Sequence, residues 1–359
     1  MVLDDAPREG ASFIMATNTR HHLLVSLKEA HGNWVSGEEL SRKLGVTRTA
    51  IWKQACSLRN EGYVIDSSTR KGYMLREALD RLLPAEIGAS LRSKRLGHRI
   101  VFEKEVDSTN RLARDLAISG AVEGTLVVAE TQTGGRGRKG RKWFSPPGEG
   151  IYLSLVLRPR FQPAEAPKMT LLAGVALAET LIPVVPSRVT IKWPNDVLTG
   201  GQKIAGILIE ISTQIDAIDY MVVGVGLNVN TQPESFPDEL RGRATSLAAQ
   251  TGRPVRRAEI LGNFLERFEQ YYDLIAGEGF APVIRRWRDL SDMAGRRVRV
   301  HSFSGSLEGT IAGIDDDGTL LLTGADGDIE RVIAGDVEYI QASGVGPQES
   351  GYKRKDFVP

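Results

Sequence analysis

The stretch Val189-Thr-Ile-Lys-Trp-Pro-Asn-Asp196, followed after Gly200-Gly201 by Lys203-Ile-Ala-Gly-Ile-Leu-Ile-Glu210, decides the fold of the largest part of this sequence. Each half is a short apolar run typical of a β-strand, and the paired glycines favour a tight turn. Two strands joined by such a turn pair antiparallel. Because proline donates no ladder hydrogen bond, we expect the first strand to end at Pro194 and to leave Asn195-Asp196 in the turn.

Helical and strand patterns alternate around this hairpin, from Ile100 to about Leu290. The clearest are helices over 168–182 and 258–275 and strands over 125–129, 151–157 and 221–229. This mixture predicts an α+β domain with a mainly antiparallel sheet and packed helices. Beyond it, short strands between 296 and 340 alternate with Gly-containing turns and predict a small β-barrel.

A helix-turn-helix precedes this domain. Ser36 with Glu39 three residues later forms a capping box, and Gly45 lies in the following turn. The next helix carries Ile51, Ala55 and Leu58 on one face, and two β-type runs around 63–75 predict a hairpin. Together these elements predict a winged helix, so we expect three domains: residues 16–82, 84–290 and 293–341.

Composition narrows the class of protein. The 359 residues include 46 Lys and Arg against 45 Asp and Glu, one cysteine and five scattered histidines. A disordered chain, a secreted disulfide scaffold and a zinc protein are therefore disfavoured. No apolar run suggests a membrane span or a signal peptide, so we expect a cytoplasmic protein without a membrane partner. Two segments, 40–60 and 131–148, each hold five Lys or Arg and no acid.

The second basic segment contains Gly135-Arg-Gly-Arg-Lys-Gly140. These letters match the dinucleotide fingerprint, but that motif opens a helix, whereas two prolines follow here. The Walker pattern fails because Arg141-Lys142 follows the last glycine. A cationic glycine loop remains, which we expect to be mobile alone and ordered by a carboxylate or phosphate. Taken by itself, such a run is more simply a solvated loop.

Two further stretches suit ligand binding. In Gly224-Val-Gly-Leu-Asn-Val-Asn230, one strand face holds only glycine and asparagine (Gly224, Gly226, Asn228 and Asn230), a floor for a planar polar ligand. The alternative is an edge strand with a bulge. Asp107-Ser-Thr-Asn110 precedes a helical pattern; it is an ordinary N-cap or a helix N-terminus that donates to a ligand.

Taken together, these runs closely resemble the biotin protein ligases. The resemblance covers about residues 100–341, and the winged helix extends it to the bifunctional class that also represses the biotin operon. It implies a class II synthetase-like catalytic domain and an SH3-like C-terminal barrel. The stretches that carry it are Asp107-Ser-Thr-Asn110, Glu130-Thr-Gln132, Gly135-Arg-Gly-Arg-Lys-Gly-Arg-Lys-Trp143, Lys192-Trp-Pro-Asn-Asp196, Lys203-Ile-Ala-Gly206 and Gly224-Val-Gly-Leu-Asn228.

The resemblance implies that ATP and biotin form biotinyl-5′-adenylate and that biotin then passes to a lysine of a carboxylase carrier domain. Lys203 and Arg138 become the catalytic candidates. No metal site is fixed by the protein alone, although Asp196 is a candidate ligand for Mg²⁺. The implied biotin-binding residues are Ser108, Thr109, Asn110, Gln132, Arg136, Gly137, Arg138 and Lys203, and the ATP-binding residues are Trp143, Lys192, Asn195, Asp196 and Asn228.

For the winged helix, the implied partner is operator DNA, and biotin is both substrate and corepressor precursor. We expect a homodimer promoted by the adenylate, because a dimer reads two half-sites. Trp52 and Cys56 are expected to be packing residues, and a protein-contact module is the alternative to DNA binding. The expected DNA-binding residues are Arg48, Thr49, Lys53, Arg70 and Lys71.

Two rival functions stay open. A lipoate protein ligase has a related fold and reaction, but the basic loop and the winged helix are hard to reconcile with it. A non-enzymatic, ligand-sensing transcription regulator is the other. The presence of Arg136, Arg138 and Lys203 argues against a decayed enzyme site.

Overall fold

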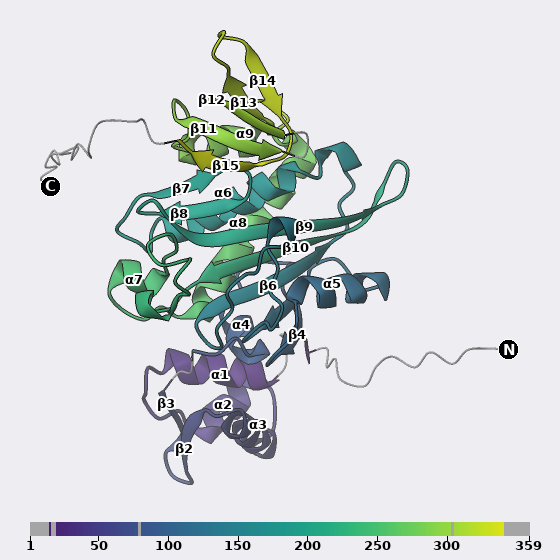
Figure 1. The fold of residues 1–359 in the computed structure, drawn as a ribbon. Helices are drawn as coiled ribbons and strands as arrows, with labels where there is room; N and C mark the ends of the chain where they lie inside the picture. The colour runs from purple at the N-terminus through teal and green to yellow at the C-terminus, as the bar shows by residue number, and fades with distance from the viewer. Residues whose placement is uncertain (1–13, 16–18, 78–79, 303–304, 341–359) are drawn as a thin grey trace, which may run out of the picture. The chain divides into compact units, whose positions relative to one another are not determined.

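The computed structural model describes residues 14–15, 19–77, 80–302 and 305–340 (Figure 1). The chain divides into two compact units, 1–292 and 293–359. Most of residues 1–15 lie outside the described residues. The polar sequence from Gly344 onward predicts disorder, and this stretch also lies outside the described residues. None of the described helices is long and apolar enough to cross a membrane.

The first unit is built on a mixed sheet of eight described strands. Only β4 and β5 pair in parallel, and every other neighbouring pair is antiparallel, which confirms the predicted α+β class. Figure 1 shows β6, β10 and β9 side by side in the middle. In sheet order the strands are β1 (Ile14–Met15), β4 (Arg99–Glu103), β5 (Thr125–Ala129), β6 (Gly150–Leu157), β10 (Ile218–Asn228), β9 (Gln202–Thr213), β8 (Asp196–Thr199) and β7 (Val189–Lys192).

The opening stretch forms three strands rather than two. β7 ends at Lys192, and Asp196 already pairs with it as the first residue of β8. The prediction that Asp196 lies in the turn is therefore wrong. The apolar Val197 and Leu198 are buried and continue the ladder, so the turn is confined to residues 193–195. The strand β1 was also missed, because two residues give no periodic pattern.

Helices cover both faces of the sheet. The helix α5 (Thr109–Ile118) packs on β5, β6 and β10, whereas α6 (Lys168–Leu181) packs on β7, β8 and β9. Gly224 lies beneath α5, and Ile207, opposite Val225, touches α6. Because strand side chains alternate, these helices lie on opposite faces. Outside the winged helix, the remaining described helical segments are α4 (Pro84–Ser90), α7 (Leu247–Thr251), α8 (Arg257–Glu278), α9 (Ala281–Leu290) and the 3₁₀ turns η1 (Arg138–Gly140), η2 (Pro163–Glu165) and η3 (Pro233–Ser235).

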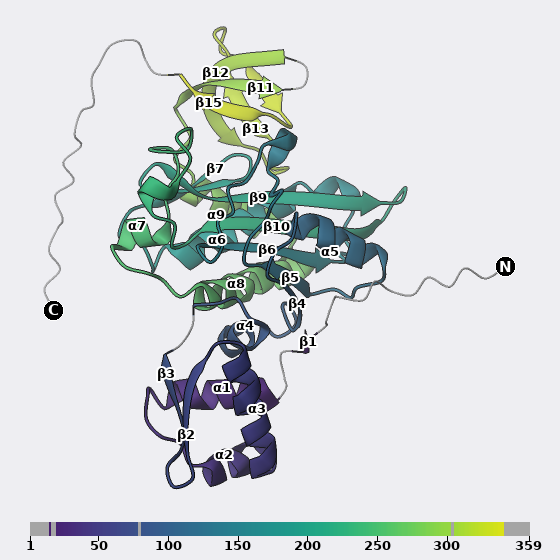
Figure 2. The ribbon, with the colours of Figure 1, turned by 60° about the horizontal axis from the view of Figure 1, so that its bottom comes forward.

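The winged helix has its predicted local signals. The Ser36 hydroxyl accepts a hydrogen bond from the Glu39 N–H (3.0 Å), and Gly45 ends α2 in the left-handed conformation. Thr47 caps α3 by accepting from the Ala50 N–H (3.2 Å). Figure 2 shows α2 and α3 with the hairpin of β2 and β3 beside them. The bounds are α1 (Thr19–Glu29), α2 (Gly37–Leu44), α3 (Arg48–Asn60), β2 (Val64–Ser68) and β3 (Gly72–Glu77).

One prediction for this domain is wrong. Trp52 was expected to pack, but it is 54% exposed, while Ile51, Ala55 and Leu58 are fully buried. A helix turns by about 100° per residue, so Trp52 points away from the buried stripe. The indole therefore belongs to the same exposed helix surface as its basic neighbours.

The second unit is an antiparallel sheet in the order β14-β13-β12-β11-β15, as the predicted small β-domain requires. Val298, Val300, Leu320 and Leu322 are buried along alternating strand positions. The strands are β11 (Arg297–Ser302), β12 (Gly305–Ile314), β13 (Leu320–Thr323), β14 (Ile329–Val332) and β15 (Asp336–Tyr339).

Candidate active site

The glycine face of β10 lies in the centre of the sheet. β10 pairs with both β6 and β9, so the alternative of an edge strand is wrong. Gly226 lies opposite Gly206 of β9, and the indole of Trp143 packs against both. A Cβ on Gly226 would approach the indole to 2.4 Å, and one on Gly206 to 3.0 Å. The two glycines therefore make room for a flat ring on the sheet.

Gly224 has a different neighbour on the same face. A Cβ there would lie 2.0 Å from the Oδ1 of Asn110, in α5. The Asn110 amide donates to the Leu208 carbonyl (3.2 Å), and its oxygen accepts from the Ser154 hydroxyl (2.6 Å). The Asn110 side chain thus joins α5 to the sheet.

The N-terminus of α5 carries the next predicted site residues. Ser108 is the N-cap by position, but its side chain makes no capping hydrogen bond and is buried. The N–H and hydroxyl of Thr109 both donate to the Gln132 Oε1 (2.9 and 3.2 Å). Gln132 in turn donates to the hydroxyl of Ser145 (3.2 Å). Thr109 at the start of α5, Gln132 before the basic loop and Ser145 after it thus form one polar cluster.

The basic loop folds back on itself. The Gly137 N–H donates to the Arg141 carbonyl (2.7 Å), and the Trp143 N–H donates to the Gly135 carbonyl (2.9 Å). The backbones of Arg136 and Lys142 form an isolated antiparallel β-bridge. The Gly134 N–H donates to the Asp107 carbonyl (2.8 Å) and so ties the loop to the entry of α5. Arg136 is exposed, and Arg138 begins η1. That the loop is mobile without an anion stays a prediction.

Lys203 lies beside the glycine face. Its ammonium pairs with Asp196 (2.5 Å) and lies 5.4 Å from the centre of the Trp143 ring. Its side chain is 35% exposed, so the charge is within reach of a ligand. The structure therefore brings Lys203, Asp196 and Trp143 together, as the predicted site requires.

The two predicted asparagines are occupied within the protein. Asn195 donates to the carbonyl of Ile207 (2.8 Å), and Asn228 donates to the carbonyl of Thr245 (3.0 Å). Both fix the edges of the glycine face, and each amide oxygen is the remaining group that can accept.

Sequence reasoning missed two hydroxyls of the polar cluster, Ser145 and Ser154. Ser154 is fully buried in the apolar strand β6, and its hydroxyl lies within hydrogen-bonding distance of the Thr109 hydroxyl (2.9 Å) as well as of the Asn110 Oδ1. A buried hydroxyl in an otherwise apolar strand needs a partner, and that signal was available in the sequence.

Next to this cluster, Tyr152 donates to the carbonyl of Pro146 (2.9 Å). Burial raises the pKa of the Tyr152 phenol, which keeps it protonated. Among the described residues, no three or more His, Cys, Asp or Glu side chains gather as a metal site.

A second basic surface lies on the winged helix. Arg48, Thr49 and Lys53 are exposed along α3, and Arg70 and Lys71 are exposed at the tip between β2 and β3. Arg48 pairs with Glu38 (2.7 Å), an exposed contact of little energy that a phosphate can replace. The exposed Trp52 lies among them and was missed as a surface residue.

The fold and the site define a ligase of the biotin and lipoate class. The model described as the Biotin/lipoate A/B protein ligase family matches residues 102–228. The HTH domain model matches 19–74, and the Biotin protein ligase C terminal domain model matches 294–339.

Whole relatives narrow this class. The bifunctional ligase/repressor BirA of Bacillus subtilis (strain 168) is 38% identical over 324 residues, which cover 90% of this chain and 99% of that protein. Its counterpart in Escherichia coli (strain K12) is 32% identical over 90% of this chain and 98% of its own. The chain belongs to this family of bifunctional biotin ligase/repressors.

A solved structure agrees with the assignment. The biotin protein ligase from Aquifex aeolicus in complex with biotin and ATP matches with a TM-score of 0.59 and 30% identity. It covers 68% of this chain and 99% of its own length.

Proposed function

We propose that this chain is an ATP-dependent biotin protein ligase that also represses transcription. Its partners are a biotin carboxyl carrier domain and operator DNA, and we expect it in the cytoplasm, where it meets both. The enzymatic half rests on one observation, the Lys203 ammonium held beside the glycine face by Asp196 and Trp143. Its relatives in Bacillus subtilis and Escherichia coli carry both functions in their names.

In the first step, the biotin carboxylate attacks the α-phosphate of ATP, the bond to the β-phosphate breaks, and biotinyl-5′-AMP forms as pyrophosphate leaves. Two anions approach, so cations must neutralise the charge that grows in the transition state. We assign this role to Arg136, Arg138 and Lys203. A charge-assisted hydrogen bond contributes about 1.5 to 3 kcal/mol, so losing one costs roughly ten- to a hundredfold in rate.

Biotin binding uses the polar cluster and the glycine face. The ureido ring needs fixed donors and acceptors, and Ser108, Thr109 and Gln132 provide them at the start of α5. We assign Gly137 to the backbone contact that a glycine loop allows. Asn110 acts here by holding α5 on the sheet.

The nucleotide side is assigned to Trp143, Lys192, Asn195, Asp196 and Asn228. When bound to the phosphates, Mg²⁺ would neutralise part of their charge. Such an ion takes most of its ligands from phosphate and water, so one carboxylate suffices, and Asp196 offers one. The basic loop covers the adenylate and limits its hydrolysis until the carrier lysine amine attacks the biotinyl carbonyl, which forms the amide and releases AMP.

The repressor half uses the basic surface of the winged helix. We assign Arg48, Thr49 and Lys53 to the major groove and Arg70 and Lys71 to the wing contacts, and we add Trp52 because it is exposed between them. A homodimer promoted by the adenylate would read two half-sites and give useful specificity.

One assay tests the ligase function. The protein is incubated with ATP, a carrier domain and either labelled biotin or labelled lipoate. We expect label in the carrier only with biotin; transfer of lipoate instead, or no transfer, would contradict the proposal.

A second experiment tests repression. Promoter DNA of the biotin genes is titrated with the protein, with and without biotin and ATP, and the same samples are sedimented. We expect a dimer and a DNA complex only with both ligands. Absence of DNA binding at every adenylate concentration would remove the repressor half.

A further inference from the structure

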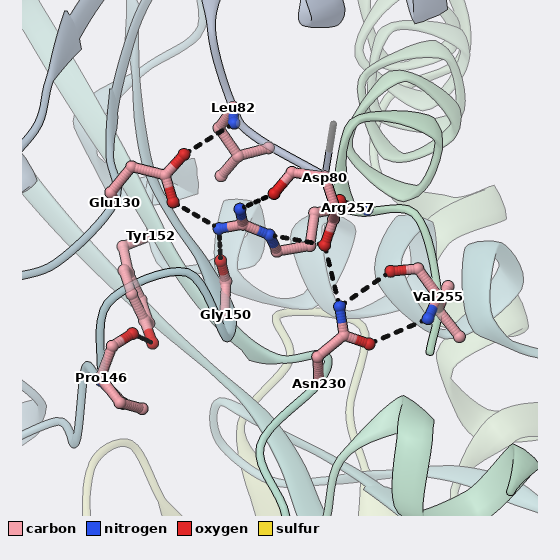
Figure 3. Close-up of polar contacts among 9 residues, drawn as sticks. All are labelled: Asp80, Leu82, Glu130, Pro146, Gly150, Tyr152, Asn230, Val255 and Arg257. Atoms are coloured by element: carbon pink, nitrogen blue, oxygen red, sulfur yellow. Dashed lines mark hydrogen bonds and ion pairs between the residues drawn. The ribbon is translucent and has the colours of Figure 1, made fainter. Parts of the chain in front are cut away.

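Arg257 is the first residue of α8, and its side chain is buried against the three segments that hold Asp80, Glu130 and Gly150 (Figure 3). The guanidinium donates to the Asp80 Oδ2 (3.1 Å), the Glu130 Oε2 (2.7 Å) and the Gly150 carbonyl (3.1 Å). It also donates to the backbone carbonyl of Asp80. A buried cation is tolerated only with such partners, because unpaired it loses its hydration without compensation.

Asp80 belongs to the connector that follows the wing. Its second oxygen accepts from the backbone N–H of Arg257 (2.8 Å), at the N-terminus of α8. A carboxylate there stabilises the helix start. Asn230, just beyond β10, donates to the same carboxylate (2.9 Å) and is hydrogen-bonded to both backbone groups of Val255. Asp80 thus connects α8 with the end of the glycine strand.

Glu130 connects the same cation with the biotin-binding cluster. Its Oε1 accepts from the N–H of Leu82 (2.8 Å), again in the connector, while its Oε2 receives Arg257. Glu130 stands two residues before Gln132, whose side-chain Oε1 accepts hydrogen bonds from both the N–H and the hydroxyl of Thr109. Gly150 begins β6 opposite Asn228. The Arg257 cluster therefore supports the chain segment that carries Gln132 and the end of the glycine strand β10.

We propose that Asp80 and Arg257 are positioning residues for biotin binding. Asp80 orients Arg257, and Arg257 orients Glu130 and the strand end that carries Gln132. The connector after the winged helix is then part of the biotin-binding structure of the enzyme. This inference rests on the proposed function, since it assumes that the site takes biotin.

The test uses full-length Asp80→Ala and Asp80→Asn variants. We expect Asp80→Ala to raise the KM for biotin about tenfold, the effect of losing one charge-assisted hydrogen bond, with kcat and the KM for ATP changed less than about twofold. Asp80→Asn keeps a side-chain acceptor for the Arg257 N–H and should recover part of the loss. Biotin affinity measured by calorimetry should follow the KM.

The control is Glu269→Gln. Glu269 is also a buried carboxylate that accepts from backbone N–H groups, those of Lys94, Arg95 and Leu96. This change should lower the melting temperature but leave the KM for biotin unchanged, which separates positioning from general stability. An unchanged KM in Asp80→Ala, with an active wild type, overturns the inference. A wild type that neither binds nor uses biotin overturns the proposed function instead.

Discussion

The two acid-free basic segments, 40–60 and 131–148, are alike in composition and differ in backbone. In the first, the cations lie along α3 and its neighbour, and each keeps a fixed place on a helix surface. In the second, glycines fold the chain back so that Gly137 bonds to Arg141 and the cations gather around one small loop. Cations spaced along a helix suit a long polyanion, whereas cations gathered around one loop suit a single small anion. The backbone conformation, and not the composition, therefore separates the two proposed ligands.

The largest expected effect is on the ligase reaction and comes from the Lys203→Ala variant. Lys203→Ala should lower pyrophosphate release from ATP and biotin by up to roughly a hundredfold, because the ammonium meets the growing phosphate charge. Its melting temperature should change little, since the side chain is partly exposed. Near-normal pyrophosphate release in this variant would sink the assignment of Lys203.

A smaller loss is expected from Gly226→Ala. The added methyl group meets the Trp143 indole, which must shift, and we expect about a tenfold weaker biotin affinity, in line with a lost contact of about 1.4 kcal/mol. Gly277→Ala, in α8, has open space at the new Cβ and should bind biotin as wild type does. Equal affinities for the two variants would show that the glycine face is not part of the site.

The Lys53→Ala variant tests the proposed DNA contacts of the first basic segment. Removing one phosphate contact should weaken promoter binding several-fold and reduce the slope of log affinity against log salt by about one. Biotinylation of the carrier should stay unchanged, because Lys53 lies on α3, a helix of the winged helix that holds none of the residues assigned to the ligase reaction. A variant that loses ligase activity and keeps the wild-type salt slope would contradict the division of labour between the segments.

The smallest effect concerns pH. Burial lowers the pKa of His21 in α1, so the unfolded chain binds the proton more readily than the folded one. The contribution of His21 to the free energy of unfolding is therefore fully present above the usual histidine pKa of about 6.5 and is lost as the pH drops below it. His21→Gln should flatten this slope in denaturant melts between pH 7.5 and 5.5. An equally steep slope in the variant would exclude His21 as its source.

Local signals in the sequence predicted much of the fold. Thr47 and the Ser36 capping box act within a few residues, and the ends of β5 follow from a short apolar run. Asp196 was misplaced because its strand is only four residues long and is fixed by pairing with β7 and β9. Trp52 was misassigned because it stands next to Ile51, near the apolar stripe, whereas the turn of about 100° per residue points its side chain away from that stripe.

Motifs in the sequence indicated some of the candidate site residues and not others. Lys203, Trp143 and Gln132 stood out by their motifs. Asp80 and Arg257 did not, because 177 positions separate them in the sequence and only the folded chain brings them together.

The place of Trp143 has a practical consequence. Its indole rests on Gly206 and Gly226 with a cation near its face, so any molecule that settles on that surface must alter the polarity around the ring. Indole emission responds to such changes, and the protein therefore carries its own optical probe for occupancy. Titrations of biotin or ATP can be followed by intrinsic fluorescence, with Trp143→Phe to identify the signal of this one ring against the other tryptophans.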